Sequence, residues 1–327
     1  MKLAILGAGA WGTALAASFS TCHATTLWTR DPGQAALMRA HRENARYLPG
    51  CELPVHLVIE SDLSRVVGQA DMMLIATPLA GLRPTLGEIR RANNALPVLW
   101  ACKGLEAGSA KLPHQIVEEE LGAGRYCGAL TGPSFADEVA RGLPTAVTLA
   151  ARDARFARET AAALHHPRLR IYANDDVIGA EIGGAVKNVM AIAAGISDGM
   201  GFGLNARAAL ITRGLAEIAR LGGALGGRRE TFMGLAGMGD LILTCTGDLS
   251  RNRRVGLALA KGLSLPEILR ELGHIAEGVS TAREVARLAL PVGVDMPITQ
   301  AVSAILFEGL SAKAAVEQLL DRDPKLE

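Results

Sequence analysis

The sequence predicts an α/β domain with a mostly parallel sheet, followed by an all-helical domain. Short apolar, β-rich runs alternate with helical stretches over residues 1–175, which is typical of parallel strands buried on both faces. Over residues 176–327 the β-branched runs vanish and apolar helical segments follow one another. A chain of 327 residues is also long enough for two domains. We therefore place the domain boundary between residues 175 and 176.

Eight short runs in the first domain are expected to form strands. They are Leu3–Leu6, Thr25–Trp28, His56–Ile59, Met72–Ala76, Pro97–Ala101, Tyr126–Leu130, Ala146–Ala150 and Leu169–Tyr172. Amphipathic segments such as Pro32–Arg42 and Pro113–Leu121 are expected to form helices between them. Helices of the second domain are expected at Ile178–Asp198, Ala206–Arg220, Val255–Lys261, Leu265–Glu271, Thr281–Leu290 and Ala312–Leu320.

Composition argues against several functional classes. The net charge is +1, so the whole molecule lacks the basic surplus of a nucleic-acid-binding protein. The five cysteines are odd in number and widely spaced, which fits a reducing cytoplasm better than a disulfide framework or a zinc site. The pair His165-His166 has no acidic residue or cysteine at ligand spacing, and we interpret it as surface residues of a turn. No metal site is expected.

A glycine-rich turn directly follows the first strand. Gly7 would allow a tight turn, Gly9 would let a pyrophosphate approach the backbone, and Gly12 would let the next helix pack closely on the strand. The helix begins near Ala10, and its first N–H groups and dipole favour bound phosphate. We therefore predict a Rossmann-type dinucleotide site in this turn, which also contains Trp11.

The same N-terminal stretch could also be a secretory signal peptide. A basic Lys2, an apolar run and the small residues Ala16–Ser18 fit that pattern. Three glycines inside the apolar run and a second strand soon afterwards argue against it. No later run is expected to be long and apolar enough to span a membrane.

The residue that ends the second strand indicates which cofactor binds. NAD-binding units usually carry an acidic side chain there, which holds the ribose 2′-OH. This chain has Arg30, whose guanidinium suits a 2′-phosphate. Asp31 could take the 2′-OH instead, although capping of the helix that begins at Pro32 is its more expected role. We therefore predict NADP(H), with NAD(H) as the alternative.

A lysine and an asparagine, Lys187 and Asn188, interrupt an otherwise apolar helix. A buried ammonium must be paired or neutralised, and a lysine in such surroundings is suited to exchange a proton near neutral pH. The alternative is a lysine that extends to the helix surface, but the small neighbouring residues would support its stem poorly. Asp240, in a glycine-rich turn, could pair with Lys187 and hold it.

Two polar segments follow strands of the first domain. Gly132 and Ser134 lie in a turn that enters a helix, which Ser134 could cap with Asp137 in its first turn. Lys103 follows another strand and could reach the same edge of the sheet. Open α/β sheets bind ligands at the carboxyl ends of their strands.

A third cluster, Ser250-Arg251-Asn252, opens a helix in the second domain. Ser250 as the cap and Arg251 and Asn252 in the first turn would form an anion site for a phosphate. The alternatives are a solvated basic helix start and a nucleic-acid patch, but the latter would need interleaved aromatic residues.

Together these motifs resemble the NAD(P)-dependent glycerol-3-phosphate dehydrogenases of the bacterial type. The resemblance runs over essentially the whole chain and includes Asn44, Tyr47–Gly50, Glu138-Val139 and Glu277–Val279. It implies a reversible reaction between sn-glycerol 3-phosphate and dihydroxyacetone phosphate. It also implies a role in glycerophospholipid biosynthesis, a cytoplasmic location and a homodimer.

The resemblance further assigns a role to each candidate residue. Lys187 would be the catalytic proton donor and acceptor. The substrate would be bound by Lys103, Gly132, Ser134, Lys187, Asn188, Asp240, Ser250, Arg251 and Asn252. The cofactor would contact Gly7, Gly9, Ala10, Trp11, Gly12, Arg30, Lys103, Ala136, Arg251, Ile275 and Glu277.

Two other functions remain open from the residues. One is a related β-hydroxy-acid or sugar-nucleotide dehydrogenase with the same two-domain plan. The other is a dinucleotide-sensing regulatory module, which would not need Lys187 and Asp240. The cluster at Ser250–Asn252 argues against the first alternative, since a phosphate anchor there suits a small phosphorylated substrate.

Overall fold

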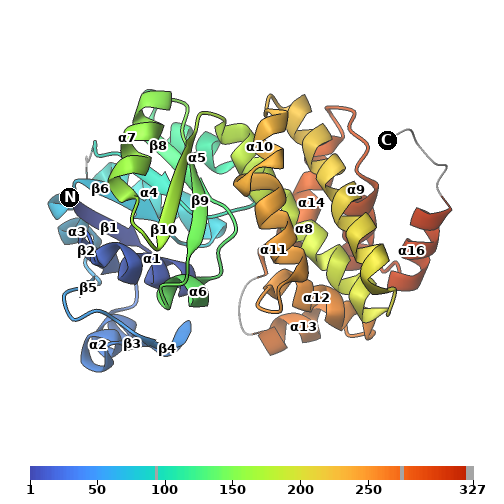
Figure 1. The fold of residues 1–327 in the computed structure, drawn as a ribbon, viewed down its shortest axis with the longest axis horizontal. Coiled ribbons are helices and arrows are strands. Elements are labelled where there is room, and N and C mark those ends of the chain that lie inside the picture. Colours follow the sequence, from blue (N-terminus) through green and yellow to red (C-terminus); the bar gives the residue numbers. More distant parts are fainter. Residues whose placement is uncertain (93–94, 273–275, 322–327) are drawn as a thin grey trace. The chain divides into compact units, whose positions relative to one another are not determined.

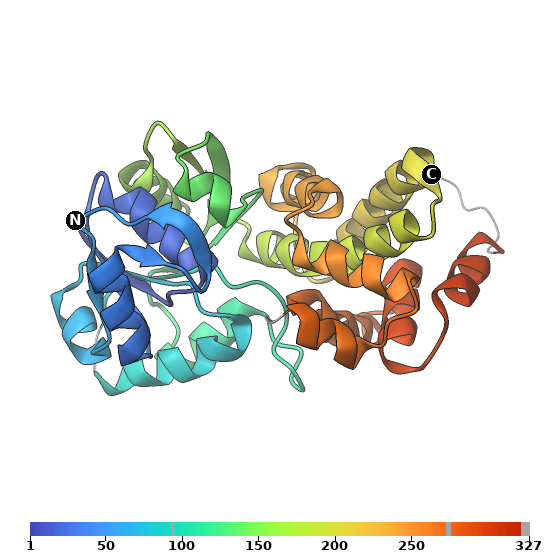
Figure 2. The same cartoon turned by 90° about the horizontal axis from the view of Figure 1, so that it is seen from below.

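The computed structural model describes residues 1–92, 95–272 and 276–321, and the chain divides into two compact units. Unit 1 comprises Met1–Lys103 and Leu112–Ala180. Unit 2 comprises Gly104–Lys111 and the described residues from Glu181 onward. Unit 1 is α/β and unit 2 is helical (Figures 1 and 2).

An eight-stranded sheet forms the centre of unit 1, in the order β10-β9-β8-β7-β6-β1-β2-β5. Neighbouring strands are parallel except β8 and β9, so the predicted mostly parallel sheet is confirmed. The strands are β1 (Lys2–Leu6), β2 (Ala24–Trp28), β5 (Val58–Glu60), β6 (Met72–Ile75), β7 (Val98–Trp100), β8 (Cys127–Thr131), β9 (Thr145–Ala150) and β10 (Leu169–Asn174).

Helices cover both faces of this sheet (Figures 1 and 2). They are α1 (Ala10–Ser20), α2 (Pro32–His41), α3 (Leu63–Gln69), α4 (Leu82–Arg91), α5 (Pro113–Leu121), α6 (Ala136–Ala140) and α7 (Ala154–Leu164), with a 3-10 turn η1 (Leu79–Gly81) before α4. All residues of β6 are buried, as the uninterrupted apolar run predicts.

The central strands of the sheet end together at one edge. Leu6 at the end of β1 pairs with Trp28 of β2 and with Ile75 of β6. The strand order reverses at β1, because β2 and β5 lie on one side of it and β6 to β10 on the other. The glycine turn therefore follows β1 at a topological switch point, where open α/β sheets bind ligands.

A short antiparallel hairpin was not predicted. It consists of β3 (Glu43–Asn44) and β4 (Leu48–Glu52). Leu48 packs with Ala14 of α1 and Val139 of α6, and so attaches the hairpin to the first helix. Two strands this short, one of them containing proline and glycine, leave little alternation to detect in the sequence.

Unit 2 is built from helices. They are α8 (Val177–Gly199), which begins at the junction of the units, α9 (Gly203–Ala224), α10 (Arg229–Met233), the single π-helical turn η2 (Leu235–Gly239), α11 (Asp240–Thr246), α12 (Arg251–Ala260), α13 (Leu265–Leu272), α14 (Glu277–Ala289), α15 (Pro297–Phe307) and α16 (Ala312–Leu320). The sequence pattern missed α15, because Thr299 and Ser303 are buried with the apolar residues and Gln300 alone does not make a polar face.

Helix α8 is the core of unit 2. By length and composition it could cross a membrane, contrary to the expectation that the chain has no such segment. However, 94% of its apolar window is buried inside the structure, as in the central helix of a globular domain. The long apolar run is therefore explained by packing against the helices around it.

The interpretation of His165-His166 as surface residues was wrong for His166. Its side chain is buried in the turn before β10 and is hydrogen-bonded to Ser18 of α1, with 2.9 Å between Nε2 and Oγ. Burial, followed by repulsion from His165 and His23, lowers the pKa of His166. Burial also lowers the pKa of His23.

These two histidines are expected to make the stability of the protein depend on pH. Because their pKa values are lower in the folded state, the unfolded chain takes up protons first, and stability is lost as pH falls below about 6.5. A His23→Gln/His166→Gln variant should lose less stability than the wild type between pH 7.5 and pH 5.5 in urea unfolding. The variant His41→Gln, which changes an exposed histidine, is the control. Equal losses in all three proteins would contradict the prediction.

Candidate active site

Two glycines in close contact, Gly7 and Gly12, shape the turn after β1. Gly7 has a φ of +125°, which L side chains rarely adopt, and a Cβ there would lie 2.9 Å from the backbone of Ala76. A Cβ on Gly12 would lie 1.9 Å from the carbonyl oxygen of Gly7. Helix α1 can therefore approach β1 this closely only with glycine at both positions.

Gly9 differs, because the chain itself does not require a glycine there. Its φ is −76°, and a Cβ would meet nothing within 4 Å. Gly9 is also the N-cap of α1 and provides no side chain to the first N–H groups of that helix. The open space and the uncapped helix end leave room for an anionic ligand.

A buried polar network, which was not predicted from the sequence, fixes the backbone of this turn. Asn44 donates from Nδ2 to the carbonyl oxygen of Ala8 at 3.0 Å and to Oγ1 of Thr13 at 2.7 Å. Gln34 donates from Nε2 to the same Ala8 carbonyl at 3.0 Å and accepts from Thr29. The signal that could have revealed Asn44 is an amide within the short segment that links α2 to β5.

Arg30 and Asp31, two residues that follow β2, have different environments. Asp31 caps α2, because its Oδ1 accepts from the N–H groups of Gly33 and Gln34 at 2.9 and 3.2 Å. Arg30 is exposed and has no ionic partner within the described residues. Its charge is therefore available to a ligand.

Helices α1 and α6 bring three of the predicted cofactor contacts into one cluster. Ala10 and Trp11 pack with Ala136 against the buried group of Ala14, Leu48 and Val139. Two further residues were predicted to contact the cofactor. Glu277 is the first residue of α14, whereas Ile275 lies outside the described residues.

Lys103, Gly132 and Ser134 also come together in unit 1. The ammonium of Lys103 lies 3.4 Å from the carbonyl oxygen of Gly132, and Ser134 donates to the same oxygen at 3.0 Å. Ser134 is not the N-cap of α6, contrary to the prediction, because Phe135 takes that position and the serine hydroxyl turns back to Gly132. Gly132 adopts a φ of +139°, which permits this turn.

In unit 2, Lys187 and Asp240 form the predicted ion pair. The ammonium lies 2.6 Å from Oδ1 of Asp240, and the two side chains are 9% and 1% exposed. Lys187 also donates to Thr244 Oγ1 at 2.9 Å, and Thr244 donates to the carbonyl oxygen of Asp240 at 2.6 Å. Thr244 was missed, although its position one helical turn after Asp240 could have indicated it. The pair compensates for burial of the ammonium.

A second chain of hydrogen bonds runs beside this pair. Asn252 donates from Nδ2 to Asn188 Oδ1 at 2.9 Å, and its own Oδ1 accepts from the N–H of Gly278 at 3.0 Å. The two predicted asparagines therefore contact each other, and Asn252 satisfies a free N–H group at the start of α14. Residues from α8, α12 and α14 are held in one arrangement.

Helix α12 begins at Arg251, which agrees with the predicted cap at Ser250 and lies four residues before the expected helical segment Val255–Lys261. Ser250 is its N-cap, and the hydroxyl accepts from the N–H of Arg253 at 3.3 Å. Arg251 is exposed in the first turn and has no ionic partner within the described residues, whereas Asn252 is buried. This helix end therefore presents an unpaired guanidinium and free N–H groups.

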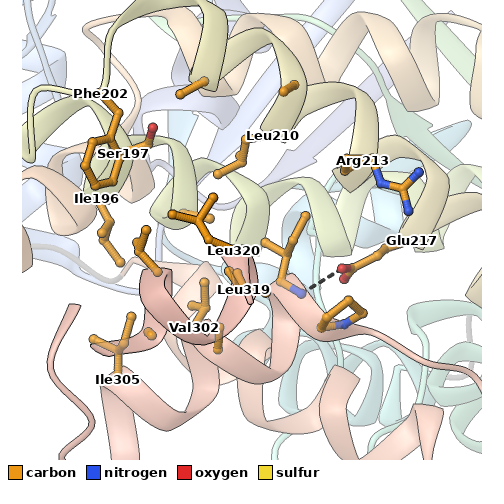
Figure 3. Close-up of a pocket in the computed structure, with 18 of the residues that line it drawn as sticks. Ile196, Ser197, Phe202, Leu210, Arg213, Glu217, Val302, Ile305, Leu319 and Leu320 are labelled. Atoms are coloured by element: carbon orange, nitrogen blue, oxygen red, sulfur yellow. Dashed lines mark hydrogen bonds between the residues drawn. The ribbon is translucent and has the colours of Figure 1, made fainter. Parts of the chain in front are cut away.

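A separate apolar cavity of about 520 Å³ lies between α8, α9, α15 and α16 (Figure 3). At its edge the buried Glu217 accepts from the N–H groups of Ile298 and Thr299 at 2.7 and 3.2 Å, and so caps α15. Burial raises the pKa of Glu217. Among the described residues, none of the predicted site residues lines this cavity.

Each of the two units has its own candidate site residues. The first has a glycine turn suited to a dinucleotide, and the second has a buried lysine held by a carboxylate, a pairing suited to proton exchange next to redox chemistry. We therefore assign the chain to the nicotinamide-nucleotide-dependent dehydrogenases.

Comparison with known proteins identifies the family. The N-terminal and C-terminal models of NAD-dependent glycerol-3-phosphate dehydrogenase match residues 2–157 and 176–317. The chain is 64% identical to glycerol-3-phosphate dehydrogenase [NAD(P)+] from Aromatoleum aromaticum, over 100% of both chains. It is also 64% identical to the enzyme of that name from Dechloromonas aromatica, over 100% of this chain and 99% of the relative. The chain belongs to this family and is an NAD(P)-dependent oxidoreductase.

Solved structures agree on the fold. The crystal structure of glycerol-3-phosphate dehydrogenase from Coxiella burnetii matches with a TM-score of 0.93 and 43% identity, over 98% of this chain and 99% of that chain. A ketopantoate reductase from Ralstonia eutropha shares the fold alone, at 18% identity and a TM-score of 0.59, over 98% and 100%.

Substitutions of two glycines in the turn should affect different properties, stability in one case and cofactor binding in the other. Gly12→Ala should destabilise the protein by about 1–3 kcal/mol, because the new methyl group cannot be accommodated beside Gly7. Gly9→Ala should leave stability unchanged and weaken NADPH binding, because only the ligand needs the space. Urea unfolding and titration of NADPH fluorescence measure the two effects. Unchanged NADPH affinity in a folded Gly9→Ala variant would contradict this assignment.

Proposed function

We propose that this protein catalyses the reversible reduction of dihydroxyacetone phosphate to sn-glycerol 3-phosphate with NAD(P)H. The observation that carries the proposal is the buried pair Lys187–Asp240 in the same unit as the exposed Arg251. The pair supplies a held proton donor, and the arginine supplies a partner for a substrate phosphate. The names of the relatives support the same reaction.

The turn in unit 1 fits the cofactor. Space at Gly9 and the uncapped start of α1 suit a pyrophosphate, with Ala10, Trp11 and Ala136 beside it. A nicotinamide cofactor bound there would supply the hydride chemistry of the reaction. We assign Glu277 and Lys103 to the cofactor as well, and Lys103 with Gly132 and Ser134 to the substrate.

We further propose a preference for NADP(H). The exposed guanidinium of Arg30 would bind the 2′-phosphate through charge-assisted hydrogen bonds. Asp31, which could have held a ribose 2′-OH, is occupied in capping α2. One oxygen of the carboxylate that would favour NAD(H) is thus engaged in the helix cap.

Lys187 is proposed to move the proton. In the reducing direction its Nζ donates a proton to the carbonyl oxygen as the carbonyl carbon receives hydride, and in the other direction the neutral amine takes the hydroxyl proton. Asp240 and Thr244 hold the nitrogen in place, since both lie within hydrogen-bond distance. Asn188, fixed by Asn252, orients the substrate oxygen. A preorganised cation also stabilises the negative charge that develops on that oxygen.

The phosphate is proposed to bind at the start of α12. Arg251 would donate paired hydrogen bonds, and Ser250 and Asn252 shape the helix end around the anion. Such an anchor distinguishes a phosphorylated triose from an unphosphorylated one. Service in glycerophospholipid synthesis, a cytoplasmic location and a homodimeric state follow from the family resemblance and stay predictions.

Removal of the proton donor should abolish turnover without loss of cofactor binding. For Lys187→Ala we expect kcat to fall by about 10³-fold or more, because general acid catalysis is lost, while NADPH affinity changes little. The assay is oxidation of NADPH by dihydroxyacetone phosphate, followed by absorbance.

A second variant controls for folding. Lys187→Ala leaves a buried carboxylate without its partner, which costs about 3–5 kcal/mol. Lys187→Ala/Asp240→Asn should recover part of that stability and stay inactive. Turnover at the wild-type rate in either protein would remove Lys187 from the mechanism.

The cofactor preference should depend on Arg30. Wild-type protein should have a higher kcat/KM with NADPH than with NADH, and Arg30→Gln should reduce that ratio about 10-fold through loss of charge-assisted hydrogen bonds. Arg91→Gln, which changes an exposed arginine at the end of α4, is the matched control. A wild-type preference for NADH would overturn the proposal.

A further inference from the structure

The arginine that follows the predicted phosphate site in the sequence has a different environment from its neighbours. Arg251 and Arg254 are exposed, whereas the Arg253 side chain is 11% exposed. Its Nε and Nη2 donate to Oδ2 of Asp198 at 2.9 and 2.7 Å. Asp198 lies near the end of α8, so this contact joins α12 to the helix that carries Lys187.

The backbone of Arg253 is tied to the same place. Its N–H donates to the Ser250 hydroxyl that caps α12. Its carbonyl oxygen would lie only 2.0 Å from a Cβ on Gly195 of α8, and a Cβ on Gly256 would lie 2.0 Å from the carbonyl oxygen of Ile192. The two helices therefore cross in close backbone contact at this residue.

We infer that Arg253 is a positioning residue for substrate phosphate recognition, and that it acts through Asp198. The inference rests on the proposed function, in which Ser250, Arg251 and Asn252 bind the phosphate. The ends of a ten-residue helix fray unless they are held. Arg253 holds the first turn of α12 through its side chain and its backbone, and so fixes where Arg251 stands.

The arrangement also explains why this position carries an arginine. Asp198 receives a second cation, because Arg207 Nη1 lies 3.1 Å from the same Oδ2, and Arg253 Nη1 extends to Asp248 at 2.8 Å. A guanidinium reaches two carboxylates from one fixed plane, which a single ammonium cannot do. Because Asp198 keeps Arg207 when Arg253 is replaced, unit 2 is not left with an unpaired buried charge.

The test compares substrates with and without the phosphate. For Arg253→Gln, kcat/KM with dihydroxyacetone phosphate should fall about 10- to 100-fold, mostly through KM, as expected when a binding group is misplaced. The kcat/KM for unphosphorylated dihydroxyacetone should stay within about twofold, since no phosphate is bound. The inhibition constant of inorganic phosphate against dihydroxyacetone phosphate should rise with KM. Asp198→Asn should act in the same direction.

Matched variants separate this role from others. Arg253→Lys should recover part of the loss, and Arg254→Gln, at the exposed neighbour, should behave as wild type. Equal losses with both substrates, or an unchanged KM in folded Arg253→Gln, would overturn the inference. Arg251→Gln is measured in parallel: a raised KM there with none in Arg253→Gln refutes the positioning role alone. No change in either variant refutes the phosphate site as well.

Discussion

The structure of unit 2 depends on the buried ion pair between Lys187 and Asp240. An ammonium in the middle of the most buried helix would be strongly unfavourable without a partner, and the pair must be held accurately for its attraction to offset the loss of hydration. Helix α11 begins at Asp240 directly after a π-helical turn, a feature common at functional sites. Thr244 adds a hydrogen bond to each partner. The contacts that stabilise the buried ammonium of Lys187 also fix its position.

Unit 1 meets a different constraint, which is steric. Helix α1 lies so close to β1 that Gly7 and Gly12 have no alternative, whereas Gly9 is free of contact with the protein. The turn therefore has two kinds of glycine: those needed for the fold and one needed only when a ligand is present. Asn44 and Gln34 then hold the carbonyl of Ala8 from outside, so the turn is rigid before anything binds. Preorganisation of this kind reduces the entropy lost on binding.

Sequence reasoning succeeded where one residue type satisfies a local rule. Apolar runs gave the strands, Ser250 and Asp31 gave helix caps, and a lysine in an apolar helix required a carboxylate partner. It failed where the decisive contact is distant or the pattern is weak. His166 is buried because it meets Ser18, 148 residues earlier, and Ser134 gives up the cap to bond Gly132. A local sequence window does not contain Ser18. Gly132 lies only two residues before Ser134, but its φ of +139°, which permits the turn, cannot be read from the sequence.

Asn188 and Asn252 show how a local sequence pattern and a contact between distant residues together define a site. Asn188 is visible in the sequence only as a polar residue beside Lys187, and Asn252 only as the neighbour of a basic residue. In the structure Asn252 donates a hydrogen bond to Asn188 and also accepts one from the N–H of Gly278. A side-chain amide can do both because it offers a donor and an acceptor at fixed geometry, whereas an aspartate at position 252 would offer acceptors alone. An acid there would place an unpaired charge against Asn188 Oδ1, so the amide is what allows α8, α12 and α14 to meet.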